Sequence, residues 1–496
     1  MNDRGQSDGL VVPAKPPNKP VSAGAEAVEE RRPAKGNTAS ETRPGHRAGV
    51  SASSDLDRVR RAAAKDRQAR FTALLHHVTV DRLRDAYRMI RPGAAAGVDG
   101  MGWHDYGQDL EGNLRDLHAR VHRGAYRATP ARRVFIPKPD GRQRPLGVAA
   151  LEDKIVQRAL VGVLNAVYEE VFLGFSYGFR PGRSPHDALD ALAVGIERRK
   201  VNWVLKIDVK DLFDTLDRAW LMRFLEHRIA DRRVLRLIQK WLAAGVIEDG
   251  KWSSTETGTA QGASVSPLLA NVFLHYVFDL WAQQWRQRRA RGDVILVRFA
   301  DDIAVGFQHR SDAERFLAVV RERFAAFGLE IAMEKTRLVE FGCYAAERRA
   351  NRGLGKPETF QFLGFTHLCA KTQVGAFRVR RVTIKKRMSA KLRELKSEMR
   401  TRAHLPIPVQ GRWLASVLAG HFRYFAVPGN INALGAFRNA VIRLWMRTLR
   451  RRSQRHRMTW ARMTLIARRW LPTARILHPW PNQRFDARTQ GRSPVR

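Results

Sequence analysis

The sequence has little cysteine, no long apolar run and, toward its end, almost no acidic residues. Cys343 and Cys369 are isolated from each other, which excludes a disulfide framework and a CxxC zinc site. No stretch approaches the roughly 18–20 uninterrupted apolar residues of a membrane span. The N-terminus also lacks the apolar segment of a secretory signal. We therefore expect a cytoplasmic protein that has no membrane as a partner.

Basic charge is in large excess, with 89 Lys and Arg against 48 Asp and Glu and a net charge of +41. Residues 376–496 carry 29 of these basic residues and three acidic ones. A solvated helical bundle and a membrane surface are the alternatives for such a region. However, unpaired cations repel one another without an anion, and arginine with interspersed tryptophan favours nucleic acid. The length of 496 residues predicts several subdomains around separate cores.

Two adjacent aspartates interrupt an apolar stretch at Val294–Phe307, VILVRFADDIAVGF. The short β-branched runs on either side predict two strands of a hairpin, with Ala300–Asp301 at the turn. Neighbouring carboxylates repel each other unless a cation lies between them, and Mg²⁺ prefers such oxygen ligands. The alternative is an exposed acidic turn without a ligand.

A third carboxylate, Asp208, ends the apolar strand predicted at Asn202–Asp208. Two-metal phosphoryl transfer requires carboxylates from separate elements. Asp208-Val-Lys-Asp-Leu-Phe213-Asp214 resembles the first catalytic motif of reverse transcriptases, and Phe299–Asp302 resembles their aromatic-x-Asp-Asp box. Gly258–Leu274, GTAQGASVSPLLANVFL, is similar to a box found in the reverse transcriptases of group II introns. Together the motifs indicate a resemblance to the group II intron reverse transcriptase and maturase family over about residues 58–485.

This resemblance implies an α+β right-hand polymerase, with fingers and palm built from an antiparallel sheet and helices, and an α-helical thumb or maturase domain. It implies two Mg²⁺ ions held by Asp208, Asp301 and Asp302. It also implies dNTP contacts at Lys138, Arg144, Phe213, Gln261 and Lys335, and a primer grip at Leu363 and Gly364. Solvated turn charges remain the alternative for Lys138 and Arg144, and a core position for Phe213. Asp217 lies near the first catalytic motif but is expected to cap a helix rather than to hold a metal.

The implied RNA contacts fall in two segments. Arg180 and Arg183 lie in FSYGFRPGRS, which resembles the family's template-contacting segment, and the others lie in the basic region: Arg443, Arg447, Arg450, Arg451 and Arg452.

Two further segments carry the resemblance. FQFLGF at Phe360–Phe365, which follows the Asp-Asp box in the sequence, resembles the primer-grip hairpin. Ala94–Gly100, which precedes both catalytic motifs, resembles an N-terminal extension motif that helps to hold template and RNA, although its spacing alone predicts only a turn.

Composition and the resemblance together divide the chain into five expected parts. They are a disordered tail (1–55), an N-terminal helical extension (56–130), fingers and palm (131–382), a helical thumb or maturase domain (383–480) and a basic C-terminal tail (481–496). Within the fingers, Arg132–Gly147 predicts a hairpin. The helix predicted at Ala150–Tyr168 would place Asp153, Lys154, Gln157 and Arg158 on its polar side.

The resemblance implies a bacterial RNA-directed DNA polymerase that extends a primer 3′-hydroxyl and assists intron splicing. Its partners would be group II intron RNA, an RNA template with a DNA primer, and dNTPs, with target DNA and a second copy of the chain as further candidates. Two departures from the family are Phe299 where Tyr is commoner and no Cys- or His-rich nuclease module of HNH type after the thumb. An RNA-binding splicing factor with a vestigial polymerase site is one alternative. A domesticated enzyme in defence or DNA repair is another.

Overall fold

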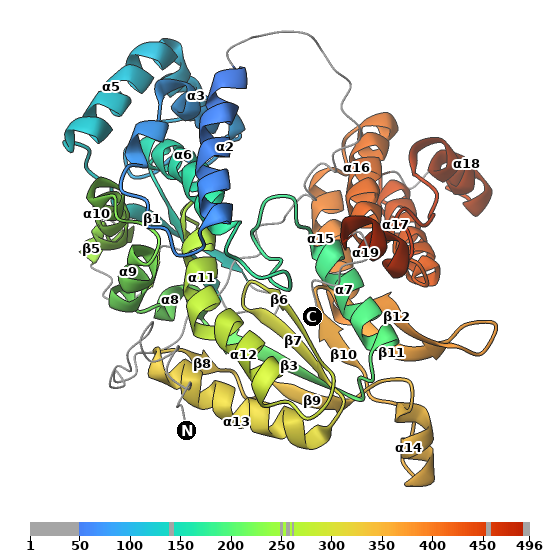
Figure 1. The fold of residues 1–496 in the computed structure, drawn as a ribbon. Coiled ribbons are helices and arrows are strands. Elements are labelled where there is room, and N and C mark those ends of the chain that lie inside the picture. The colour runs from blue at the N-terminus through green and yellow to red at the C-terminus, as the bar shows by residue number, and fades with distance from the viewer. Residues whose placement is uncertain are drawn as a thin grey trace, which may run out of the picture.

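The computed structural model describes residues 49–137, 143–248, 251–253, 258–259, 262–452 and 458–489, with the backbone alone at 49–54, 137 and 144. Helices and strands are mixed along this part of the chain, which confirms the expected α+β class. Figure 1 shows an N-terminal group of helices and a C-terminal group of helices on opposite sides of the molecule, with a sheet below and between them. Most of the predicted tail, residues 1–48, lies outside the described residues.

The central sheet is antiparallel and has the order β6-β7-β3-β8, with β9 pairing beside β3. Its strands are β3 (Trp203–Lys210), β6 (Val294–Phe299), β7 (Asp302–Phe307), β8 (Glu330–Ile331) and β9 (Arg337–Glu340). Phe299 pairs with Asp302, so β6 and β7 form the predicted hairpin with Ala300–Asp301 as its two-residue turn. Every residue of β6 is buried, including Arg298 at the end of the apolar run Val294–Val297.

Helices cover one face of this sheet, where Leu205 and Ile207 of β3 belong to the largest core. These helices are α9 (Arg218–Glu226), α11 (Ser266–Leu274), α12 (Leu280–Arg288) and α13 (Arg310–Ala326). The opposite face, with Val204 and Val297, packs against α7 (Pro185–Arg198) and a second antiparallel sheet, β10-β11-β12. This second sheet comprises β10 (Phe360–Phe362), β11 (Phe365–Lys371) and β12 (Phe377–Thr383). Asp208 faces the β10-β11-β12 side, because alternate strand residues share a face.

The region predicted as fingers contains a third sheet, β2-β1-β4-β5, in which β1 and β2 form the expected hairpin. Its strands are β1 (Ala131–Pro137), β2 (Gln143–Val148), β4 (Val246–Glu248) and β5 (Lys251–Ser253). The other helices of the N-terminal half are α2 (Gly49–Lys65), α3 (Val80–Met89), α4 (Trp103–Tyr106), α5 (Leu110–Arg123), α6 (Leu151–Tyr168), α8 (Leu212–Thr215) and α10 (Arg232–Ala243). Gly97 lies so close to α6 that an added Cβ would be 2.5 Å from the Cα of Ala150. The Ala94–Gly100 loop therefore packs tightly against the fingers.

The helix α6 forms where it was predicted, but only part of its polar side is accessible. Arg158 is exposed and Lys154 is partly exposed, whereas Asp153 is 2% exposed and Gln157 is 3% exposed. Asp153 accepts hydrogen bonds from the Tyr126 hydroxyl and the Thr129 amide, and Gln157 accepts one from the Ser264 amide. These two side chains are buried because they find partners in segments distant in the sequence.

The C-terminal helices enclose a separate core that includes Leu414, Phe437 and Trp445. They are α15 (Lys385–Thr401), α16 (Ile407–Phe425), α17 (Ile431–Arg450) and α18 (Trp460–Trp470), while α14 (Ala345–Asn351) projects from the lower edge of the molecule (Figure 1). Residues 481–489 form helix α19 (Pro481–Thr489) rather than the expected tail. Phe485 of α19 is buried, and Asp486 forms an ion pair with Arg198 of α7 at 2.7 Å. None of the described helices has the length and apolar character needed to cross a membrane.

Candidate active site

Asp208 and Asp302 are register partners on the adjacent antiparallel strands β3 and β7. Directly opposite residues of such a pair have Cβ atoms about 4.5–5.5 Å apart, so the two carboxylates start from neighbouring positions. Asp301 immediately precedes Asp302 in the hairpin turn. The side chains of Asp208 and Asp302 are 26% and 27% exposed, which leaves them accessible at the end of a buried sheet. The fold thus brings the three aspartates into one region.

Two lysines contact these carboxylates. Lys335, for which the resemblance implies a dNTP contact, has its Nζ 2.9 Å from Asp208 Oδ2. Lys206 of β3 forms an ion pair with Asp302 and also donates to the Ile207 carbonyl at 3.1 Å. The Lys335 side chain is 58% exposed, whereas that of Lys206 is 13% exposed. The more buried contact is therefore the one that the sequence did not indicate.

The aspartates fit an open magnesium site better than a closed protein cage. Among the described residues, no three His, Cys, Asp or Glu side chains are close enough together to hold a metal by themselves. In this arrangement lysines engage Asp208 and Asp302. Mg²⁺ usually takes only one or two protein carboxylates and completes its octahedron with phosphate and water. The donor set at β3 and β7 suits that chemistry.

Backbone strain is concentrated in the same segments. Four non-glycine residues among those described have a positive φ, and all lie in motifs singled out above: Phe179 (60°), Asp211 (44°), Ala300 (57°) and Leu363 (44°). Side chains other than glycine rarely adopt this conformation, which costs about 1–3 kcal/mol per residue. Such strain persists where the surrounding packing fixes the backbone, and it is common at functional sites.

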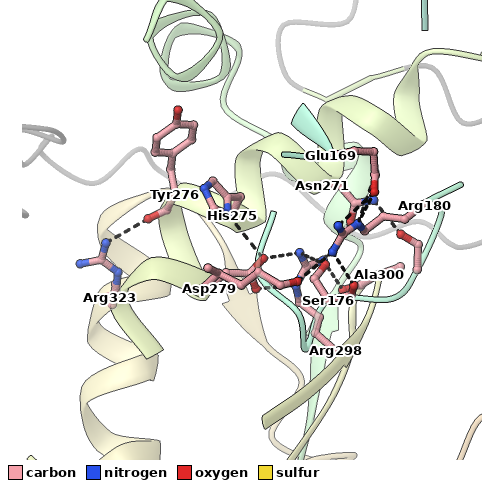
Figure 2. A network of polar contacts seen from close by, with 12 residues as sticks. Glu169, Ser176, Arg180, Asn271, His275, Tyr276, Asp279, Arg298, Ala300 and Arg323 are labelled. Carbon is pink, nitrogen blue, oxygen red and sulfur yellow. Dashed lines mark hydrogen bonds and ion pairs between the residues drawn. The ribbon is translucent and has the colours of Figure 1, made fainter. Parts of the chain in front are cut away.

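Arg298 fixes the strained turn from inside the protein (Figure 2). Its guanidinium is fully buried and forms a two-pronged ion pair with Asp279, at 2.7 Å to Oδ1 and 2.5 Å to Oδ2. It also donates to the Ala300 carbonyl at 3.2 Å, to Asn271 Oδ1 at 3.0 Å and to Ser176 Oγ at 2.7 Å. Arg298 therefore joins the Asp-Asp turn to the Gly258–Leu274 box and to the segment around Ser176.

A π-helical turn, His275–Asp279, brings Asp279 to this arginine. Burial lowers the pKa of nearby His275 to about 4, so this imidazole is neutral at pH 7 and Arg298 is the cation that balances Asp279. The backbone of the FSYGFRPGRS segment also packs against the Asp-Asp turn. A Cβ at Gly178 of this segment would lie 2.3 Å from the Ala300 amide nitrogen. Short π-helical segments within α-helices are frequent at functional sites.

Arg180 and Arg183 do not have equal access to a nucleic acid. The Arg180 side chain is 2% exposed, and its guanidinium donates to Glu169 and to the carbonyls of Leu173 and Ser176. This burial contradicts the expected phosphate contact and gives Arg180 the role of holding the loop together. Arg183 remains partly exposed, although Nη1 donates to the Gly174 carbonyl at 2.6 Å.

Phe213 lies in α8, two residues after the strained Asp211. Its ring is partly exposed and meets Phe179 of the template segment edge to face, with ring centroids 6.2 Å apart. Lys138 and Gln261 lie outside the described residues, as does the side chain of Arg144. Gly262, which follows Gln261, has a φ of 105°, and a Cβ there would lie 2.7 Å from the Gly147 carbonyl oxygen. The Gly258–Leu274 box thus approaches the β1-β2 hairpin closely at Gly262, a position that requires glycine.

Leu363 and Gly364 form the two-residue turn between β10 and β11, both with positive φ. Two-residue hairpin turns of this type strongly prefer Asn-Gly or Gly-Gly, so leucine is strained at the first position. The hydroxyl of Tyr424 in α16 donates to the Leu363 carbonyl at 2.8 Å. Phe362 lies next to the turn, and its ring centroid is 5.9 Å from Lys206 Nζ. The expected primer-grip turn is therefore linked both to the C-terminal helices and to the carboxylate site.

Residues 136–367 match the family model described as reverse transcriptase (RNA-dependent DNA polymerase). The chain is 35% identical to protein YkfC of Escherichia coli (strain K12) over 238 residues, which are 47% of this chain and 62% of that protein. It is 37% identical to the group II intron-encoded protein LtrA of Lactococcus lactis subsp. cremoris over 166 residues, 33% of this chain and 27% of LtrA.

A putative COX1/OXI3 intron 2 protein of Saccharomyces cerevisiae is 35% identical over 162 residues, 32% of this chain and 19% of that protein. The chain is thus similar to reverse transcriptases over residues 136–367 and, over shorter stretches, to a group II intron-encoded protein and an intron protein. It spans less than two thirds of the length of each of these relatives. The α+β fold is polymerase-like in the region that the family model matches.

The basic residues expected to bind RNA lie on the exposed side of the last long helix. Arg443, Arg447 and Arg450 follow one another at helical spacing along α17 and are exposed, as are Arg451 and Arg452 at its end. Arg450 donates to the Met458 carbonyl at 3.0 Å, and Arg452 donates to the Ala403 carbonyl at 2.6 Å. The side chains of Arg443, Arg447 and Arg451 show no hydrogen bond or ion pair to another described side chain.

Sequence reasoning missed Lys206, Arg298 and Asp279. Each had a usable signal, because each is a charge inside an otherwise apolar element: WVLKI, VILVRF and HYVFDLW. A charge that is fully buried requires a charged or hydrogen-bonding partner. The sequence signals such a partner without saying which distant segment supplies it.

Proposed function

We propose that this protein is an RNA-directed DNA polymerase of group II intron type that also assists intron splicing. The observation that carries the proposal is the register pairing of Asp208 with Asp302, with Asp301 in the adjoining turn. Carboxylates of separate strands at the accessible end of a rigid sheet are what nucleotidyl transfer requires. In the proposed reaction, the 3′-oxygen of a primer attacks the α-phosphate of a dNTP, and pyrophosphate leaves.

Asp208, Asp301 and Asp302 would hold two Mg²⁺ ions. Bound there, the ions would supply charge stabilisation for the phosphoryl oxygens and activate the primer hydroxyl. The protein supplies the fixed frame: Arg298 holds the turn through the Ala300 carbonyl, and Lys335 meets Asp208. Catalysis of this kind depends mainly on positioning and electrostatics.

The other candidate residues take roles around this centre. Phe213 would exclude the ribose 2′-hydroxyl of the incoming nucleotide, which selects dNTPs. Lys138, Arg144 and Gln261 would contact the nucleotide, and the turn Leu363–Gly364 would seat the primer end. Their positions in one motif order, with strained backbone at Asp211 and Leu363, support this assignment.

The maturase activity would rest on RNA binding by the basic C-terminal region. Arg443, Arg447 and Arg451 are exposed and lie on or beside one helix, where a row of cations suits a phosphate backbone. We assign residues 56–130 to an N-terminal extension, 131–382 to fingers and palm, and 383–480 to the thumb. Intron RNA, primer and template are accordingly the proposed partners.

Primer extension tests the proposal. The full chain is incubated with a DNA primer on an RNA template, dNTPs and Mg²⁺, beside the Asp301→Ala/Asp302→Ala variant. We expect synthesis by the natural protein and none by the variant, while both bind intron RNA with similar affinity. Synthesis that persists in the variant would refute the metal assignment. RNA binding and splicing assistance without any synthesis by the natural protein would indicate the splicing-factor alternative.

A further inference from the structure

Lys206 lies on the same face of β3 as Asp208 and Lys210, because alternate residues of a strand share a face. Its ammonium forms an ion pair with Asp302 and donates to the Ile207 carbonyl at 3.1 Å. The Phe362 ring of the primer-grip hairpin lies 5.9 Å away. With 13% of its side chain exposed, Lys206 is held by three different neighbours at the centre of the site.

This lysine alters the charge of the carboxylate group. Asp208, Asp301 and Asp302 together carry three negative charges, and like charges at such distances disfavour one another. Lys206 and Lys335 reduce the local charge to minus one. The two lysines are not equivalent, since the Lys335 side chain is 58% exposed and its ion pair is therefore more strongly screened by water and salt.

Resting on the proposed function, we propose that Lys206 is an internal counterion that holds Asp302 before a divalent cation binds and then competes with that cation. The same carboxylate cannot serve an ammonium ion and a divalent cation equally well, so the lysine lowers the cation affinity of the site. Release of Asp302 does not leave the ammonium without partners, because the Ile207 carbonyl and the Phe362 ring remain beside it. Lys206 therefore acts as a positioning residue.

The experiment measures binding of Mn²⁺, as a probe for Mg²⁺, to the full chain without nucleic acid, by electron paramagnetic resonance of the free ion. Lys206→Met is compared with two matched variants that remove the same charge from neighbouring positions. Lys335→Met removes the exposed lysine, and Lys210→Met removes a lysine of the same strand that pairs with Glu330 at 3.1 Å.

We expect Lys206→Met to tighten Mn²⁺ binding about five- to tenfold, because removing a half-buried counterion increases the attraction for the cation. Lys335→Met should tighten Mn²⁺ binding only about twofold, because this lysine is exposed. Lys210→Met should leave the Mn²⁺ affinity unchanged. A second readout is the melting temperature. In EDTA, Lys206→Met should melt below the natural protein because Asp302 has lost its partner, and saturating Mn²⁺ should reduce this difference.

Asp302→Asn separates this inference from the proposed function. If Asp302→Asn loses Mn²⁺ binding while Lys206→Met binds as the natural protein does, Lys206 is only a structural ion pair and the inference is wrong, although the metal assignment stands. Weaker binding by Lys206→Met would also overturn it, since the lysine would then orient the carboxylate. If neither Asp302→Asn nor Asp208→Asn alters Mn²⁺ binding, the proposed metal site itself fails. Lys206→Gln, which keeps a hydrogen-bond donor, provides the same comparison should the methionine variant not fold.

Discussion

The buried ion pair between Arg298 and Asp279 allows the effect of one substitution to be worked out in detail. Both side chains are 0% exposed, and the guanidinium meets both carboxylate oxygens. Arg298→Met leaves an uncompensated buried charge at Asp279, so we expect the free energy of unfolding to fall by about 3–5 kcal/mol. Arg310→Met is the matched control, because Arg310 is 61% exposed in its pair with Glu314. It should cost less than about 1 kcal/mol.

The double variant Arg298→Met/Asp279→Leu removes both charges together. Apolar replacement of a buried pair is often neutral, so we expect it to regain most of the stability lost in the single variant. Polymerase activity should not return with it. The Ala300 carbonyl would still lack its donor, and Ala300 directly precedes Asp301 in the strained turn. Stability and activity should therefore separate in this pair of variants.

Urea unfolding followed by tryptophan fluorescence gives the stability of each protein, and primer extension at a temperature where all remain folded gives the activity. Two results would refute the reasoning. One is an Arg298→Met variant as stable as the natural protein. The other is a double variant that regains activity along with stability, which would mean that the contact between Arg298 and Ala300 does not position the turn.

Three further expectations concern other residues. Phe213→Ala should admit ribonucleotides in primer extension, and unchanged sugar discrimination would exclude Phe213 as the gate. Replacing Arg443, Arg447 and Arg451 with glutamine should reduce the slope of log affinity for RNA against log salt by about 2–3, whereas replacing three exposed arginines of α13 should not. Burial raises the pKa of Asp153 from 3.8 to about 6, so its stabilising contribution is present below pH 4 and is lost as the pH rises through 6. The difference in melting temperature between Asp153→Asn and the natural protein should consequently shrink from pH 4.5 to pH 7.5.

Local sequence patterns predicted the elements that position the site. The apolar runs beside Asp301 predicted β6 and β7 with the turn at the correct two residues. Asp217 was expected to cap a helix, and it accepts a hydrogen bond from the Trp220 amide at the start of α9. These features depend on residues within a few positions of one another, where strand alternation, turn chemistry and capping act directly.

The features that could not be predicted depend on distant partners. Arg180 is buried because Glu169 and two carbonyls surround its guanidinium, although its neighbours in the sequence are those of an exposed loop. The end of the chain was expected to be a tail, yet Asp486 of α19 pairs with Arg198 across 288 residues. Composition indicates how many charges must be balanced, and only the tertiary fold decides which charge meets which.

The most direct test of the central claim is the position of a bound cation relative to the three aspartates. Crystals of the full chain with a primer, an RNA template, a non-reactive dNTP analogue and Mn²⁺ would show the ion by its anomalous scattering. We predict anomalous peaks in contact with the carboxylates of Asp208, Asp301 and Asp302. Mn²⁺ bound elsewhere, together with continued DNA synthesis by Asp208→Asn, would contradict the account.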